Sequence, residues 1–190
     1  MKLTKQDLAV KIQDFTHYYA DMYRKAFGHL PTVETDAQWP SPCLVEAFDD
    51  EKETWQPVKI EESLAFENIE QALSLDIHED IKTYFTCVYS DSVYAECSEG
   101  KLSLLFPWSK EDFARLQENI IGHVLMKRKL KQAITIFFAV TDQEDLILSI
   151  NNETGEVWVE RVGCEPHKKL SDSLAEFIET LVPYTALAEF

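Results

Sequence analysis

Hydrophobic residues between positions 109 and 130 recur at three- and four-residue steps, which is the spacing of one face of an α-helix. Ser109 precedes this stripe and Asp112 lies three residues later, so the pattern predicts a capping box at the start of the helix. Four basic residues between Lys127 and Lys131 crowd the predicted end, where the helix dipole favours cations. The stripe contains Phe113, Leu116, Ile120 and Val124, with Ile121 and Leu125 at its sides.

Three further segments have helical spacing. Residues 4–27 form a long stripe that ends at Gly28, with Thr4 and Asp7 as a second capping-box candidate. Shorter helices are predicted near 61–73 and over 77–89, the latter with carboxylates in its first turn. A last helix is predicted after Ser171 as N-cap, ending at Pro183.

Between these helices the period of the pattern changes to that of strands. Runs at 93–98 and 101–106 flank Glu99-Gly100, a pair that favours a hairpin turn. The run ITIFFAV, residues 134–140, has the composition of a buried strand, and two more strands follow at 146–150 and 156–162. A short strand is also predicted at 43–48. We therefore expect one α+β domain over residues 1–190, with a central mostly antiparallel or mixed sheet of about five to six strands flanked by helices.

The net charge of −16 is concentrated in the middle of the chain. Residues 34–99 hold seventeen acids and three bases, a net charge of −14, whereas residues 1–33 carry a net charge of +2. Such a field repels nucleic-acid phosphates and anionic lipids except at a local basic patch. A basic protein partner fits this charge better. The acidic run at 49–53 can equally be a solvated loop, which is the usual explanation of such runs.

Candidate chemistry is sparse. No glycine-rich phosphate loop, GxSxG or HExxH motif is present, so we predict no catalytic residue, no metal site and no cofactor. His78, Glu79 and Asp80 are adjacent in a predicted helix and point in different directions, which disfavours a shared metal. The four cysteines show no CxxC spacing and are expected to be free thiols. A nucleophilic pair of histidine with Cys43 or Cys97 has no positive support.

The termini and the polar residues of the long helix give weaker indications. The N-terminus lacks the apolar core of a signal peptide, and no apolar run reaches the ~18 residues of a membrane span, so a cytoplasmic location is expected. Gln117 and His123 lie in or beside the apolar stripe of the helix. We expect both to form hydrogen bonds across a helix–sheet boundary.

Several segments resemble the Syd family of bacterial SecY-interacting proteins, whose fold is related to the SUKH immunity and scaffold domains. The longest is WSKEDFARLQENIIGHVLMKRKLKQ at 108–132, followed by ITIFFAV at 134–140. Shorter matching pieces are Pro40-Ser41-Pro42-Cys43, Trp55-Gln56-Pro57, Asn152-Glu153-Thr154-Gly155-Glu156 and Ser173-Leu174-Ala175-Glu176-Phe177.

The resemblance implies a non-enzymatic cytoplasmic protein that binds SecY, the channel subunit of the protein translocase, and regulates or quality-controls it. It implies loose association with the cytoplasmic side of the inner membrane, indirectly through SecY. The negative charge of the chain separately argues against nucleic-acid binding. The basic cytoplasmic loops of SecY would then meet an acidic surface. We expect that surface to be drawn from Glu34, Asp36, Glu46, Asp49, Asp50, Glu51, Glu53, Glu61, Glu62, Asp76, Glu79 and Asp80.

An alternative follows from the immunity-like fold that the resemblance implies. The same acidic surface could capture and neutralise a basic toxin, for example a nuclease.

Overall fold

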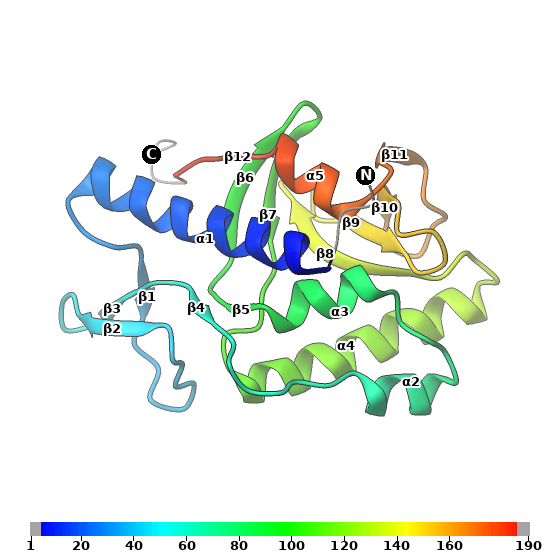
Figure 1. The fold of residues 1–190 in the computed structure, drawn as a ribbon, viewed down its shortest axis with the longest axis horizontal. Helices are drawn as coiled ribbons and strands as arrows, with labels where there is room; N and C mark the ends of the chain where they lie inside the picture. Colours follow the sequence, from blue (N-terminus) through cyan, green and yellow to red (C-terminus); the bar gives the residue numbers. More distant parts are fainter. Residues whose placement is uncertain (1–4, 186–190) are drawn as a thin grey trace.

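A computed structural model of the chain describes residues 5–185, and Figure 1 shows how its elements are arranged. The helices are α1 (Lys5–Phe27), α2 (Glu67–Leu73), α3 (Glu79–Thr86), α4 (Lys110–Lys129) and α5 (Leu174–Thr180). The strands of the largest sheet are β6 (Val93–Cys97), β7 (Gly100–Leu104), β8 (Thr135–Thr141), β9 (Leu146–Asn151), β10 (Val157–Arg161), β11 (Lys168–Ser171) and β12 (Val182–Pro183). The remaining strands are β1 (Thr32–Glu34), β2 (Leu44–Ala47), β3 (Lys52–Trp55), β4 (Val58–Lys59) and β5 (Val88–Tyr89).

Helix α4 begins where the capping residues predict. The Ser109 hydroxyl accepts a hydrogen bond from the Asp112 amide at 3.2 Å, which confirms the N-cap. The Asp112 carboxylate accepts in return from the amide of Trp108 at 2.9 Å, one residue before the N-cap. The start of α4 is therefore fixed together with Trp108, a residue that reappears in the candidate site.

The central sheet has seven strands in the order β11-β10-β9-β8-β7-β6-β12, and its paired strands are all antiparallel. This confirms the predicted α+β class and the five longer strands. Cys97 pairs with Gly100, so the hairpin turn consists of Ser98 and Glu99 rather than of Glu99 and Gly100. The short strands β11 and β12 extend the two edges of the sheet beyond the predicted strands.

Helices cover both faces of this sheet, and neighbouring phenylalanines of β8 mark the two layers. Phe137 lies edge-on to the His123 ring of α4, with the ring centroids 5.5 Å apart. Phe138 packs edge-on against Tyr84 of α3 and Phe177 of α5, at 5.6 and 5.8 Å. Helix α1 lies along α3 and α5 on that second side. One hydrophobic cluster links these layers.

A buried polar network joins α4 to the sheet. Lys127 and Glu160 are both fully buried, with the ammonium 3.2 Å from a carboxylate oxygen. The Lys127 ammonium also donates to the Cys164 carbonyl at 2.7 Å, and the Thr135 hydroxyl donates to Glu160 at 2.8 Å. Lys127 is therefore not one of the solvated cations at the helix end. It lies three residues after Val124, on the predicted stripe, and points into the sheet.

His123 completes this network and confirms the predicted bond across the helix–sheet boundary. Its Nε2 lies 3.3 Å from the Thr135 hydroxyl oxygen. Because Thr135 uses its hydrogen for Glu160, the imidazole must donate through Nε2. Burial, reinforced by the Lys127 charge, lowers the His123 pKa from 6.5 to about 4. The imidazole is therefore neutral near pH 7.

Several local predictions differ from the structure. The helix predicted near 61–73 begins only at Glu67, and the last helix ends at Thr180 rather than at Pro183. The helix predicted over 77–89 ends at Thr86, because Val88 and Tyr89 pair with β4 instead. Ser173, rather than Ser171, caps α5, since residue 171 still belongs to β11. Gln117 donates to the Ala65 carbonyl before α2, not to the sheet. The capping role predicted for Thr4 lies outside the described residues.

Candidate partner-binding site

The candidate site is built around a small three-stranded antiparallel sheet with the order β1-β3-β2, which lies at the left end of Figure 1. Glu34 faces Lys52 across the β1–β3 ladder, whereas Glu53 lies between Val33 and Ala47. Lys52 is the one basic residue between positions 32 and 55. Seven of the predicted contact residues belong to this small sheet and its loops: Glu34, Asp36, Glu46, Asp49, Asp50, Glu51 and Glu53.

The acidic run at 49–53 forms the turn between β2 and β3 and the start of β3. The Asp49 carboxylate accepts the amides of Glu51 and Lys52 at 2.8 and 2.7 Å, which fixes the turn. The Phe48 amide donates to the Lys52 carbonyl at 2.8 Å and closes the loop. Asp49 therefore has a structural role, while Asp50 and Glu51 are exposed at the tip of the turn.

A hollow of about 330 Å³ separates the small sheet from the start of α4, and we name it the tryptophan pocket. Trp108 donates its indole N–H to the Trp39 carbonyl at 3.3 Å, and the Ser41 hydroxyl donates to the Trp108 carbonyl at 2.5 Å. These two bonds hold the loop before β2 against α4. The pocket is lined by Val33, Glu34, Asp36, Trp39, Leu44, Glu53, Asp91, Trp108, Asp112 and Arg115.

A second hollow of about 470 Å³ lies between the small sheet and α1, and we name it the tyrosine pocket. Its walls are mostly aromatic: Tyr19 stacks on Trp55 at 6.3 Å, and His29 packs against Phe48 at 4.6 Å. Asp91 lines both pockets and therefore lies between the two hollows. The tyrosine pocket is lined by Tyr19, Tyr23, His29, Pro31, Thr32, Phe48, Lys52, Trp55, Asp91, Ser92 and Tyr94.

The electrostatics of the tryptophan pocket favour a cation. Five carboxylates and one guanidinium line it, so the negative groups are in clear excess. Burial raises the pKa of the Asp91 carboxyl, although the Ser92 amide donates to it at 2.7 Å. A positive group that entered the pocket would face several carboxylates together with the faces of aromatic rings.

The other predicted contact residues lie elsewhere. Glu61 and Glu62 follow β4 and are already near cations: Glu61 lies 3.3 Å from Lys59, and Glu62 lies 3.7 Å from Lys110. Glu62 also accepts the Tyr89 hydroxyl at 2.7 Å. Glu62 therefore lies beside the start of α4, and neither carboxylate lines either pocket.

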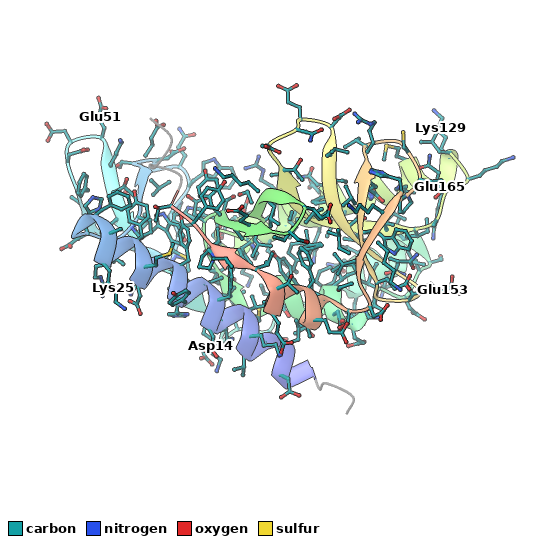
Figure 2. The ribbon with its side chains drawn as sticks, turned by 90° about the horizontal axis from the view of Figure 1, so that it is seen from above. Asp14, Lys25, Glu51, Lys129, Glu153 and Glu165 are labelled. Carbon is teal, nitrogen blue, oxygen red and sulfur yellow. The ribbon has the colours of Figure 1, made fainter. Side chains whose placement is uncertain are left out.

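Asp76, Glu79 and Asp80 surround the N-terminus of α3, next to the turn between β9 and β10. The Asn152 side chain donates to the Asp76 carbonyl at 2.8 Å and accepts the His78 amide at 3.0 Å. Figure 2 places Glu153 of this turn at the opposite end of the long axis from Glu51. The twelve predicted residues thus occupy three places, and only the group on the small sheet adjoins the two pockets.

Sequence reasoning missed the residues that give the tryptophan pocket its shape and polarity: Trp39, Asp91, Trp108, Asp112 and Arg115. Asp112 has a capping role, and Arg115 is an exposed residue of α4. The loop residue Trp39 lies 69 positions before its hydrogen-bond partner Trp108. Only the recurrence of tryptophan at 39, 55 and 108, each within two residues of a proline, could have drawn attention to this region.

The described residues hold little that suggests covalent chemistry. Within 5–185, no group of three or more His, Cys, Asp or Glu side chains could hold a metal ion. Burial raises the Cys43 pKa to about 12, which keeps this thiol protonated and makes it a poor nucleophile. All four cysteines are free, and Cys164 is exposed. In the same range, no helix has the length and apolar character of a membrane span.

The acidic and aromatic lining of the two pockets suits the binding of a basic ligand. The model of a family described as "Syd protein (SUKH-2)" matches residues 9–183 of this chain. Curated relatives named Protein Syd match at similar length. The protein from Colwellia psychrerythraea is 53% identical over 198 residues, covering 100% of this chain and 99% of that protein. Those from Alteromonas mediterranea and Yersinia pestis are 46% and 34% identical, covering 94% and 93% of this chain and 98% and 96% of their own lengths.

The chain therefore belongs to the Syd family, as its sequence resemblance predicted.

Proposed function

We propose that this protein binds the SecY subunit of the bacterial protein translocase through the acidic small sheet and regulates or quality-controls SecY. Family membership supports this function, and the gathering of seven carboxylates on one three-stranded sheet carries the choice of surface. Cytoplasmic loops of membrane proteins are enriched in Lys and Arg by the positive-inside rule. Basic loops of SecY therefore supply the complementary charge.

The free energy that each ion pair contributes determines what kind of binding to expect. An exposed ion pair contributes only ~0.2–1 kcal/mol, so several carboxylates must act together. Long-range attraction between a negative and a positive surface mainly accelerates association, and salt weakens it strongly. The protein would then lie on the cytoplasmic side of the inner membrane through SecY, with no direct insertion into lipid.

The test is a charge reversal that spares the fold. Glu46, Asp50 and Glu51 are exposed, and Asp49 is left unchanged because it fixes the turn. We expect the triple variant Glu46→Lys, Asp50→Lys and Glu51→Lys to weaken binding to SecY-containing nanodiscs by about ten- to a hundredfold. The dissociation constant is measured at low and at high salt, and the difference between variants should shrink as salt rises.

The matched control carries the same change of net charge away from the small sheet, with Glu118→Lys, Glu144→Lys and Glu153→Lys. All three positions are exposed. If both triple variants bind SecY equally well, the small sheet is not the contact surface. A pull-down that recovers a secreted nuclease domain and no translocase component would favour the toxin-binding alternative over SecY.

A further inference from the structure

The tryptophan pocket already contains a cation that belongs to the protein itself. The Arg115 guanidinium lies over the Trp39 ring, with its central carbon 4.6 Å from the ring centroid. Trp39 is held in place for this contact because its carbonyl accepts the Trp108 indole N–H. Asp36 fixes the same loop by accepting the Gln38 amide at 2.8 Å. An aromatic wall held by hydrogen bonds and a resident guanidinium therefore share one pocket.

Carboxylates surround Arg115, but its guanidinium is held by stacking on Trp39 rather than by an ion pair with a described residue. Glu34, Asp36, Glu53, Asp91 and Asp112 line the same pocket. Among the described residues, no carboxylate lies within ion-pair distance of Arg115. The side chain is also exposed, so it can leave the pocket without disturbing the core of the protein.

A guanidinium fits these walls better than an ammonium. Arginine is planar, stacks on aromatic faces and is weakly hydrated, whereas lysine is a compact and strongly hydrated charge. The pocket offers the face of Trp39 and the side chain of Trp108 beside several carboxylates. This combination recognises a stacked planar cation that also receives hydrogen bonds at its edge.

We propose that the tryptophan pocket receives one arginine side chain of a basic partner, and that Arg115 occupies this position in the unbound protein and is displaced on binding. Arg115 is then an internal competitor that lowers the affinity of the pocket for isolated basic segments. A partner must supply additional contacts to replace it. This inference rests on the proposed function for the identity of the partner, but the competition can be tested without SecY.

The test removes the competitor. An exposed cation–π contact contributes about 0.5–1 kcal/mol, so we expect Arg115→Gln to tighten binding by about two- to fivefold beyond the general effect of losing one positive charge. Lys110→Gln measures that general effect, because Lys110 is an exposed cation of the same helix that does not line the pocket. Arg115→Lys keeps the charge but stacks less well, so its binding should lie between wild type and Arg115→Gln.

Two probes are used with these variants, namely SecY in nanodiscs and a synthetic peptide of alternating Gly and Arg together with its Lys counterpart. The proposal predicts that Arg115→Gln gains more affinity than Lys110→Gln and that the difference persists in high salt. It also predicts that the Arg peptide binds more tightly than the Lys peptide. Equal gains by the two variants, weaker binding of Arg115→Gln or preference for the Lys peptide would each overturn it.

The two probes also separate this inference from the proposed function. Absence of SecY binding together with the expected peptide results would reject SecY as partner and keep the arginine pocket. Normal SecY binding with equal effects of both variants would keep the function and reject the role of Arg115. Failure of both probes to bind would reject both proposals.

Discussion

Buried and exposed carboxylates of this protein have different surroundings and are therefore expected to contribute to different properties. Glu160 is fully buried beneath α4 and contacts Lys127 and Thr135. The carboxylates of Asp50 and Glu51, by contrast, are exposed at the tip of the small sheet. A buried charge is tolerated only when it is fully paired, whereas an exposed one is solvated by water. The buried carboxylate is expected to affect the stability of the fold, and the exposed carboxylates are expected to affect association with a partner.

The largest expected effect follows from breaking the buried pair. Glu160→Gln leaves the Lys127 ammonium buried without its counter-charge, and removing one partner of such a pair costs about 3–5 kcal/mol. Chemical denaturation monitored by circular dichroism measures this loss of unfolding free energy. The double variant Lys127→Met with Glu160→Leu removes both charges and should recover most of it. A single variant as stable as wild type would contradict the importance of the pair.

A smaller effect should appear as a pH dependence of stability. The His123 pKa is lowered from 6.5 to about 4 in the folded protein, so the unfolded chain binds a proton more readily. Stability is therefore fully present above about pH 6.5 and falls as the pH is lowered toward 4, by up to about 3 kcal/mol. Denaturation curves at successive pH values measure this slope.

The comparison variant for this titration is His123→Gln, which keeps a donor for the Thr135 hydroxyl but cannot titrate. Subtracting its pH dependence from that of wild type removes the contribution of the other ionisable groups. If the two proteins lose stability in parallel between pH 6.5 and 4, His123 is not protonated on unfolding.

The smallest effect on stability is expected at the exposed acids. Glu51→Lys should change the unfolding free energy by less than about 0.5 kcal/mol, because its side chain is exposed at the tip of a turn. Thermal denaturation at matched salt measures this change. A loss as large as that of Glu160→Gln would show that the small sheet depends on these carboxylates for folding, and the contrast between the two groups would disappear.

The long, periodic segments could be predicted from the sequence because local chemistry decides them. The Ser109 cap, the stripe of α4 and the β6–β7 hairpin each follow from residues close together in the chain. The sequence groups Lys127 with the other cations at the end of α4, because a charged side chain near a helix end is normally exposed. Lys127 follows Ile120 by seven residues and Val124 by three, and this spacing indicates that it lies on the buried face of α4.

The candidate site was harder to predict because its parts are distant in sequence. The strands β1 and β3 contain only three and four residues. Pairing between such short strands determines their structure more than the intrinsic β-propensity of their residues does. The acidity of residues 34–53 was visible, but no local pattern indicates that Trp39 meets Trp108 or that Asp91 lies between two pockets. Such contacts are products of the tertiary fold.

The position of α1 also has a consequence for how the protein is made. This helix packs against α5, and Lys11 forms an ion pair with Glu179, so its partner lies near the other end of the chain. At translation rates of about 5–20 residues per second, α1 waits on the order of 10 s or more before α5 has been synthesised. During that interval its apolar stripe, which includes Leu8, Ile12 and Tyr19, lacks this cover. Nascent chains should therefore be targets for chaperones until α5 has been synthesised.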